Sequence, residues 1–249
     1  IYKSGKIGKQ TYHPLPQLLP SCMNSGGFRT TKRKNATKGF SLKNYAYIVL
    51  YSHGFNPEWP DYLDAETGVF RYYGDNRKPG NDYLATKNNG NRILQETFAL
   101  LNSGNDLSDI PPFLLFKNCE YTKGVQFLGL AAPGNPHISP DRDLVSFWRT
   151  LGDRRFQNYE SYFTVLKTEE IKNKWLQALI YDHDNSMKYA PEVWKRFIEN
   201  GRDGIEALRA PKIKNVIPSR KEQLPRDAEG KKVLEKIISY YKEPEATYF

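Results

Sequence analysis

Hydrophobic positions along the first two thirds of the chain follow the spacing of β-strands. Residues 45–52 read Tyr-Ala-Tyr-Ile-Val-Leu-Tyr-Ser, and this run of β-branched and aromatic residues predicts a buried strand. The types at 69–73 also suit a pleated, half-buried surface. Shorter apolar runs predict further strands at 113–116, 126–131 and 162–166.

The spacing changes to that of helices in two places. Residues 89–102 carry apolar side chains at helical intervals, which predicts one helix between the strands. Three more helices are predicted near the end, over 169–179, 191–199 and 226–242. The pattern predicts an α+β protein in one domain, with a mixed β part over about 1–168 and a mostly helical part over about 169–249.

The segment 70–80 joins a strand end to a polar turn. Gly74 tolerates positive φ, and the Asp and Asn that follow bond their own backbone readily. Aromatic rings, a carboxylate, an amide and two cations are also the parts of a nucleobase-binding site. Ordinary turn composition explains most of the same residues. On the functional interpretation, Tyr72, Tyr73, Asp75 and Asn76 contact a base, and Arg77 and Lys78 contact phosphate.

A second candidate is the basic segment 24–34. Gly26 and Gly27 would let the backbone approach a partner closely, and four cations follow within six residues. We predict a loop in which Arg29, Lys32, Arg33 and Lys34 contact DNA. The alternative is a solvated surface loop.

The charge balance supports an anionic partner. The chain carries 37 Lys and Arg against 28 Asp and Glu, for a net charge of +9 and a pI near 9.3. Nucleic acid is the first expectation and an anionic membrane the second, although a merely soluble basic protein has the same balance. No apolar run reaches the about 18 residues of a membrane span. The only cysteines, Cys22 and Cys119, indicate no disulfide framework, so a cytoplasmic protein is expected.

Catalytic motifs are sparse. The four histidines are scattered without metal-ligand spacing, and no phosphate-binding glycine loop is present. Pro140-Asp141 followed by Glu170-Ile171-Lys172 matches a metal-dependent nuclease pattern formally. The second half falls in the helix predicted over 169–179, where side chains two positions apart diverge by roughly 200°. We therefore expect no catalytic residue, metal or cofactor in this chain, and keep a small metal-dependent nuclease as an alternative.

Several ordered blocks resemble one known family. These are Gly26–Arg29, Trp59–Gly68, Tyr72–Gly80, Gly129–Gly134 and Arg155–Thr164, with weaker similarity at Pro191–Trp194 and Gln223–Pro225. Together they resemble the N-terminal recognition domain of AspBHI-type modification-dependent restriction endonucleases, over roughly residues 20–249. The resemblance implies an SRA-like (PUA-like) β pseudobarrel with flanking helices and a helical C-terminal third. It also implies that a nuclease domain, which would use Mg²⁺, follows in the full-length prokaryotic protein and is absent from this chain.

The expected function is sequence-specific recognition of double-stranded DNA. The resemblance implies a reader that extrudes a modified cytosine, 5-methylcytosine in particular, and holds it between rings. Asp75 would then accept from the cytosine amino group, and Tyr72 or Tyr73 would stack on the base.

Outside the pocket, Gln157 and Asn158 are predicted to contact base edges, and Arg154 and Arg155 to enter grooves or hold phosphates. The alternatives are a reader of an unmodified site without base flipping, an RNA-binding module, and the nuclease above. An oligomer of the full-length protein is left open, and no membrane partner is expected.

Overall fold

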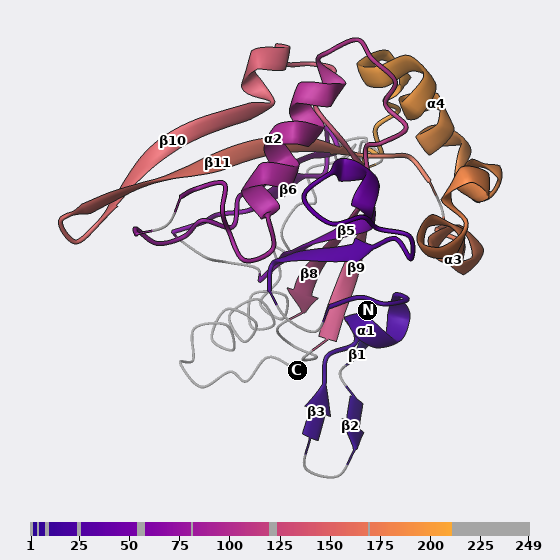
Figure 1. Cartoon of the computed structure of the whole chain (residues 1–249), viewed down its shortest axis with the longest axis horizontal. Coiled ribbons are helices and arrows are strands. Elements are labelled where there is room, and N and C mark those ends of the chain that lie inside the picture. The colour runs from indigo at the N-terminus through magenta and orange to yellow at the C-terminus, as the bar shows by residue number, and fades with distance from the viewer. Residues whose placement is uncertain are drawn as a thin grey trace, which may run out of the picture. The chain divides into compact units, whose positions relative to one another are not determined.

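Figure 1 shows the computed structural model of the chain. It describes residues 2–3, 5–7, 10–23, 26–53, 58–80, 82–119, 124–168 and 170–210. The helix predicted over 226–242 lies outside these residues.

Within the described residues, nine strands form one mixed sheet, and strands β2 and β3 pair separately. The main path through the sheet runs β4-β5-β8-β9-β11-β7-β6, with β1 added to β9 and β10 added to β11. Among the strands of the described residues, only β5 and β8 pair in parallel. The strands are β1 (Tyr2–Lys3), β2 (Gly5–Ile7), β3 (Gln10–Tyr12), β4 (Phe28–Lys32), β5 (Tyr45–Ser52), β6 (Tyr62–Asp64), β7 (Val69–Tyr73), β8 (Phe113–Cys119), β9 (Gly124–Pro133), β10 (Leu144–Leu151) and β11 (Arg154–Val165).

The predicted strands are confirmed, and the strongest lies in the core. All eight residues of β5 are buried, because this strand has neighbours on both edges and is covered on both faces. Its continuous apolar run is what burial on both faces requires. The strand β7 has the predicted bounds, whereas β8, β9 and β11 are longer than the apolar runs that predicted them, most of all β11, which begins at Arg154.

Helices cover the sheet and follow it in sequence. The helix α2 (Gly90–Leu101) packs Phe98 against Phe163 of β11, with ring centroids 5.5 Å apart. After the last strand come α3 (Asn173–Tyr181), the 3-10 helix η4 (His183–Tyr189), α4 (Glu192–Asn200) and η5 (Gly201–Gly204). Short helical turns also occur as α1 (Leu15–Leu18), η1 (Leu42–Asn44) and η3 (Pro140–Arg142).

The predicted α+β class is confirmed, whereas the β pseudobarrel that the resemblance implies is not shown, since no closed barrel is found among the described residues. Over the described residues the sheet path is open, since β4 and β6 end it and do not pair with each other. These two strands are therefore edges of the sheet.

Two local expectations are wrong. The basic segment is not a loop throughout, because Phe28–Lys32 pairs with β5 as strand β4. The helix predicted from residue 169 begins only at Asn173, because Lys172 has an extended backbone at φ −73° and ψ 131°.

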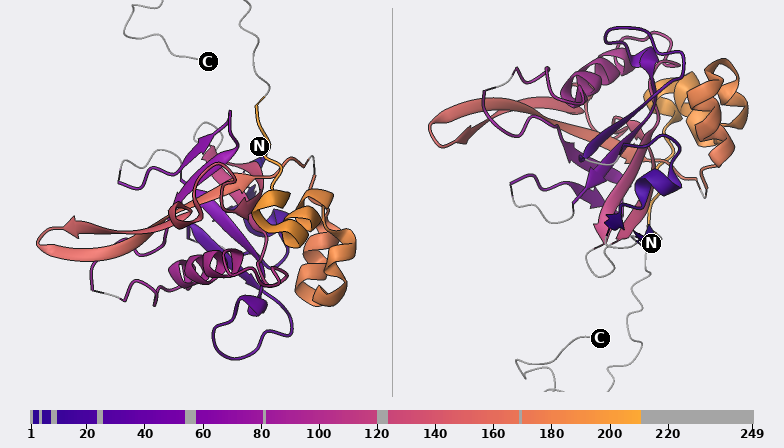
Figure 2. Two further views of the ribbon diagram at one scale, coloured as in Figure 1. Left: turned by 90° about the horizontal axis from the view of Figure 1, so that it is seen from above. Right: turned by 60° about the horizontal axis from the view of Figure 1, so that its bottom comes forward.

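The most prominent feature is a hairpin made of β10 and the first half of β11. It extends away from the body, on the side opposite α3 and α4 (Figures 1 and 2). Leu151 pairs with Arg154, so only Gly152 and Asp153 form its turn. Gly152 has φ 62°, and a two-residue turn of the II′ type needs glycine at this first position.

Candidate nucleic-acid interface

The arm of the hairpin is exposed, cationic and partly apolar. Three of its large apolar side chains remain accessible, with exposed fractions of 58% for Trp148, 55% for Leu151 and 41% for Val145. Arg154 and Arg155 are exposed at its tip. A two-stranded ribbon of this kind has the size that the major groove of B-DNA admits.

An aromatic cluster joins the arm to the body. Trp59, which precedes β6, packs against Tyr73, Phe147 and Phe156 with ring centroids 5.8, 6.2 and 6.1 Å away. The guanidinium of Arg149 lies 4.4 Å from the centre of the Trp59 ring. Cation–π contacts of this kind and the buried rings fix the direction in which the hairpin leaves the sheet.

A part-buried carboxylate lies beside this cluster. Asp61 Oδ1 accepts a hydrogen bond from the Tyr73 amide at 3.1 Å. Burial raises the pKa of Asp61 to about 6, against the lowering effects of that hydrogen bond, of Arg77 and of a hydrogen bond that the Ser52 side chain donates. Removing a carboxylate from water costs free energy, so a position of this kind is a candidate for a functional site.

Two further groups face the same region. The Tyr72 hydroxyl is buried and has no hydrogen-bond partner among the described residues. A Cβ on Gly27 would lie 3.4 Å from this hydroxyl and 3.9 Å from an Arg77 nitrogen, so the backbone of Gly27 approaches both. An acceptor, an unpaired hydroxyl and a guanidinium thus gather next to the root of the hairpin.

Comparison with known proteins identifies the family. Residues 1–209 match the family model "Restriction endonuclease AspBHI N-terminal". The chain belongs to this family. Comparison with curated proteins found no match.

Three solved structures are similar to this chain. The DNA modification-dependent restriction endonuclease AspBHI is 33% identical, with a TM-score of 0.72 over 84% of this chain and 92% of that one. The DNA recognition domain of the cytosine modification-dependent restriction endonuclease LpnPI is 31% identical, with a TM-score of 0.71 over 86% and 90%. The MspJI restriction endonuclease in complex with a 27-mer oligonucleotide shares the fold, with 21% identity and a TM-score of 0.60 over 98% and 61%.

In this member of the AspBHI N-terminal family, Asp75 caps a helix. Its two carboxylate oxygens accept from the amides of Gly90 at 3.1 Å and Asn91 at 3.0 Å, the first residues of α2. Asn89, the residue in the capping position, has a left-handed backbone and makes no side-chain cap. Asp75 supplies the missing acceptor from fifteen residues earlier in the chain, at the helix end where a negative charge is stabilised.

Two predicted base-contacting amides are buried in the same network. Asn158 Oδ1 accepts from Asn91 Nδ2 at 3.0 Å, and Asn158 Nδ2 donates to the Gly74 carbonyl at 3.1 Å. Asn76 Nδ2 donates to the Gln157 carbonyl at 2.8 Å. In this conformation Asn158 bonds Asn91 and the backbone, and Asn76 bonds the backbone, so their contact with a base stays a prediction that requires these hydrogen bonds to open.

The two tyrosines predicted to stack on a base, Tyr72 and Tyr73, are buried as well. Tyr72 is fully buried, and Tyr73 is 7% exposed with its hydroxyl donating to Glu160 Oε2 at 2.8 Å. Neither ring presents a free face to the surface in this conformation. Gln157 is the more accessible of the two predicted groove-contacting amides, and its Nε2 donates to Ser146 Oγ at 3.3 Å.

The predicted cations fall into separate groups. Arg29 is buried and donates to the carbonyls of Gly26 and Met23 at 2.8 and 3.0 Å. Arg33 is also buried, whereas Lys32, Lys34 and Lys78 are exposed. The Lys34 amide bonds to the Ile180 carbonyl of α3, so this segment lies far from the hairpin tip that carries Arg154 and Arg155 (Figure 1).

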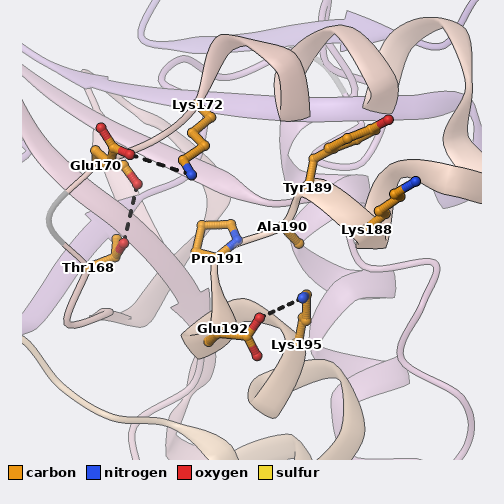
Figure 3. A pocket seen from close by; sticks show the side chains of 9 residues that line it. All are labelled: Thr168, Glu170, Lys172, Lys188, Tyr189, Ala190, Pro191, Glu192 and Lys195. Atoms are coloured by element: carbon orange, nitrogen blue, oxygen red, sulfur yellow. Dashed lines mark hydrogen bonds and ion pairs between the residues drawn. The ribbon is translucent and has the colours of Figure 1, made fainter.

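The formal nuclease pattern does not assemble a metal site in the described part of the chain. Glu170 and Lys172 pair with each other at 3.8 Å on the edge of a cavity of about 390 Å³ (Figure 3). A second pair, Glu192 with Lys195 at 2.6 Å, lies across it, and Asp141 is not among the lining residues. Over the described residues, no three His, Cys, Asp or Glu side chains gather as potential ligands.

The helices described are all too short or too polar to cross a membrane.

Sequence reasoning missed Asp61, Trp59 and Arg149. Trp59-Pro60-Asp61 stands out as one of the blocks that resemble the family, which is the one signal that points to it. Nothing in the local pattern shows that this loop meets the hairpin, because Trp59 and Phe156 are almost one hundred positions apart.

Proposed function

We propose that this chain is the DNA recognition domain of a modification-dependent restriction endonuclease. It binds double-stranded DNA, extrudes a cytosine that carries a 5-methyl group, and reads that base beside Asp61. Membership of the AspBHI N-terminal family and the likeness to the LpnPI recognition domain support the class of function. The net charge of +9 and the cationic hairpin support a nucleic-acid partner.

The observation that carries the base-reading proposal is the part-buried carboxylate of Asp61 next to the unpaired Tyr72 hydroxyl. A cytosine presents an amino group to a carboxylate and acceptors to a hydroxyl or a guanidinium. A bound base would therefore provide hydrogen-bond partners for the Asp61 carboxylate and the Tyr72 hydroxyl, which are costly to bury without partners. Arg77, whose guanidinium lies 5.8 Å from the Trp59 ring centre, holds positive charge where the extruded nucleotide brings its phosphate.

The hairpin has a separate role in this proposal. Its arm enters a groove next to the extruded base, with Arg154 held against the phosphate backbone. The aromatic cluster around Trp59 connects the arm to the loop that carries Asp61, so groove contact and base extrusion are positioned by one rigid unit.

We expect this chain to bind a duplex that contains 5-methylcytosine at least tenfold more tightly than the matched unmethylated duplex. The test is a binding screen of paired duplexes with randomised flanks, with the matched RNA duplex as competitor. Affinity for both DNA duplexes should fall as the salt concentration rises. Each phosphate contact should steepen the slope of log affinity against log salt concentration by about 0.9. Equal affinity for all pairs at every flank would contradict modified-base reading, and preference for RNA would contradict the DNA assignment.

We expect no DNA cleavage by this chain with Mg²⁺ or Mn²⁺, because cleavage is assigned to a separate nuclease domain of the full-length protein. The measurement is incubation of methylated plasmid with the purified chain and either metal ion. Cleavage that disappears in both Asp141→Ala and Lys172→Ala would show instead that the formal nuclease pattern is active.

A further inference from the structure

The register of the hairpin sorts its side chains onto two faces. Directly opposed residues of an antiparallel pair share a face, and successive residues alternate. Trp148 opposes Gln157 and Thr150 opposes Arg155, so these four lie together. Arg149 opposes Phe156 and Leu151 opposes Arg154, which places this second set on the other face.

The two faces have different surroundings. On the face of Arg149, this guanidinium and Phe156 both contact Trp59, and Leu151 and Arg154 next to the turn are exposed on it. The face of Trp148 has no such cover, and its indole is 58% exposed. An exposed tryptophan on a projecting strand costs hydration free energy unless a partner covers it.

Arg155 is oriented by this exposed ring. Its guanidinium carbon lies 5.2 Å from the centre of the Trp148 ring. Among the described residues no carboxylate lies within ion-pair distance of Arg155, so its donors are not committed to a protein acceptor. Gln157, directly opposite Trp148, adds a side-chain amide to the same face.

We propose that Arg155, positioned by Trp148, reads a guanine in the major groove next to the modified cytosine. This inference rests on the proposed function and adds the base that the hairpin selects. A guanidinium donates two parallel hydrogen bonds to the O6 and N7 atoms of guanine, a pattern that no other base presents in this groove. The indole limits the freedom of the arginine before binding, so less entropy is lost when the bidentate contact forms.

Trp148 is a positioning residue in this scheme, and Arg155 determines specificity. Lysine keeps the positive charge of Arg155 but cannot make the bidentate contact. Arg154, the neighbouring arginine on the opposite face, provides a matched control because Arg154→Lys makes the same chemical change where no base is read.

The experiment measures binding of the full chain to methylated duplexes in which each flanking base pair is replaced in turn. In the wild type, one guanine should be required, with a loss of roughly tenfold or more on replacement. Arg155→Lys should reduce that discrimination to about threefold or less, with non-specific affinity unchanged. Trp148→Ala should reduce the discrimination for guanine in part, and Trp148→Phe, which keeps an aromatic ring, should show the discrimination of the wild type.

The outcomes separate this inference from the function on which it depends. Full discrimination in Arg155→Lys at every flanking pair, or an equal loss in Arg154→Lys, overturns the guanine assignment and leaves methylcytosine recognition standing. A wild type that does not distinguish methylated from unmethylated duplexes overturns the proposed function, and the guanine assignment with it. Melting temperatures within about 2 °C of the wild type show that the variants are folded.

Discussion

The variant Asp61→Asn is expected to lose roughly ten- to hundredfold in affinity for a methylated duplex while binding random duplex as the wild type does. The Asn oxygen can keep the hydrogen bond from the Tyr73 amide, which leaves the NH₂ group to face the cytosine amino group. Two donors then oppose each other in a site with little water. An unmade hydrogen bond with a buried partner costs about 1–3 kcal/mol, and 1.4 kcal/mol is a factor of about ten.

The same substitution should not destabilise the fold at neutral pH. Burial raises the pKa of Asp61 to about 6, so the folded state binds a proton more tightly than the unfolded state does. This group therefore contributes stability below about pH 4 and loses that contribution as the pH rises through about 6. Asparagine is neutral throughout, so the melting temperature of Asp61→Asn relative to the wild type should rise between pH 4 and pH 7.

The measurements are melting temperature across this pH range and affinity for methylated, unmethylated and random duplexes. Glu199→Gln, on the exposed side of α4, removes one negative charge away from the site and should change neither quantity. A folded Asp61→Asn protein that still prefers the methylated duplex by the wild-type factor would remove Asp61 from the base-reading site.

The variant Asp75→Ala is expected to lose about 1–3 kcal/mol of unfolding free energy, because two amides at the start of α2 lose their acceptor in a buried place. The preference of the folded protein for methylated DNA should remain. If Asp75 instead accepts from the flipped cytosine, that preference falls ten- to hundredfold. Denaturant unfolding together with the ratio of specific to random affinity decides between the two roles.

Gly90→Ala provides an independent test of the cap. Alanine normally favours a helix over glycine by about 1 kcal/mol. Here a Cβ on Gly90 would lie 2.5 Å from Asp75 Cγ, so we expect Gly90→Ala to destabilise the protein. Glu96→Ala, at an exposed position of the same helix, is the control and should be nearly neutral. A stabilised Gly90→Ala protein would contradict the cap.

The sequence by itself determined the central strands, the helix between them and the kind of partner to expect. The apolar run at 45–52 is long, uninterrupted and β-branched, so local preference and burial agree, and β5 has the predicted bounds. The apolar stripe at 89–102 gave α2 for the same reason. The ordered blocks that resemble the AspBHI family led to the correct family.

Local pattern could not show what each polar residue of segment 74–80 contacts. Asp75, Asn76 and Asn158 have the composition of a base-contacting site, and the structure uses them to cap α2 and to join β7 to β11. The partners lie fifteen to eighty-four positions away in sequence, so no window of residues contains both ends of these hydrogen bonds.

Tertiary structure alone decided which carboxylate is removed from water and which cations are exposed on the surface. Asp61 acquires its raised pKa from burial beside Tyr73, and Arg155 acquires a free position because its strand projects beyond the sheet with Trp148 beside it. Both properties depend on desolvation and on which faces other elements cover. Desolvation and the covering of faces are set by the packing of strands that are distant in sequence. The residue types at 61 and 155 do not indicate how those strands pack.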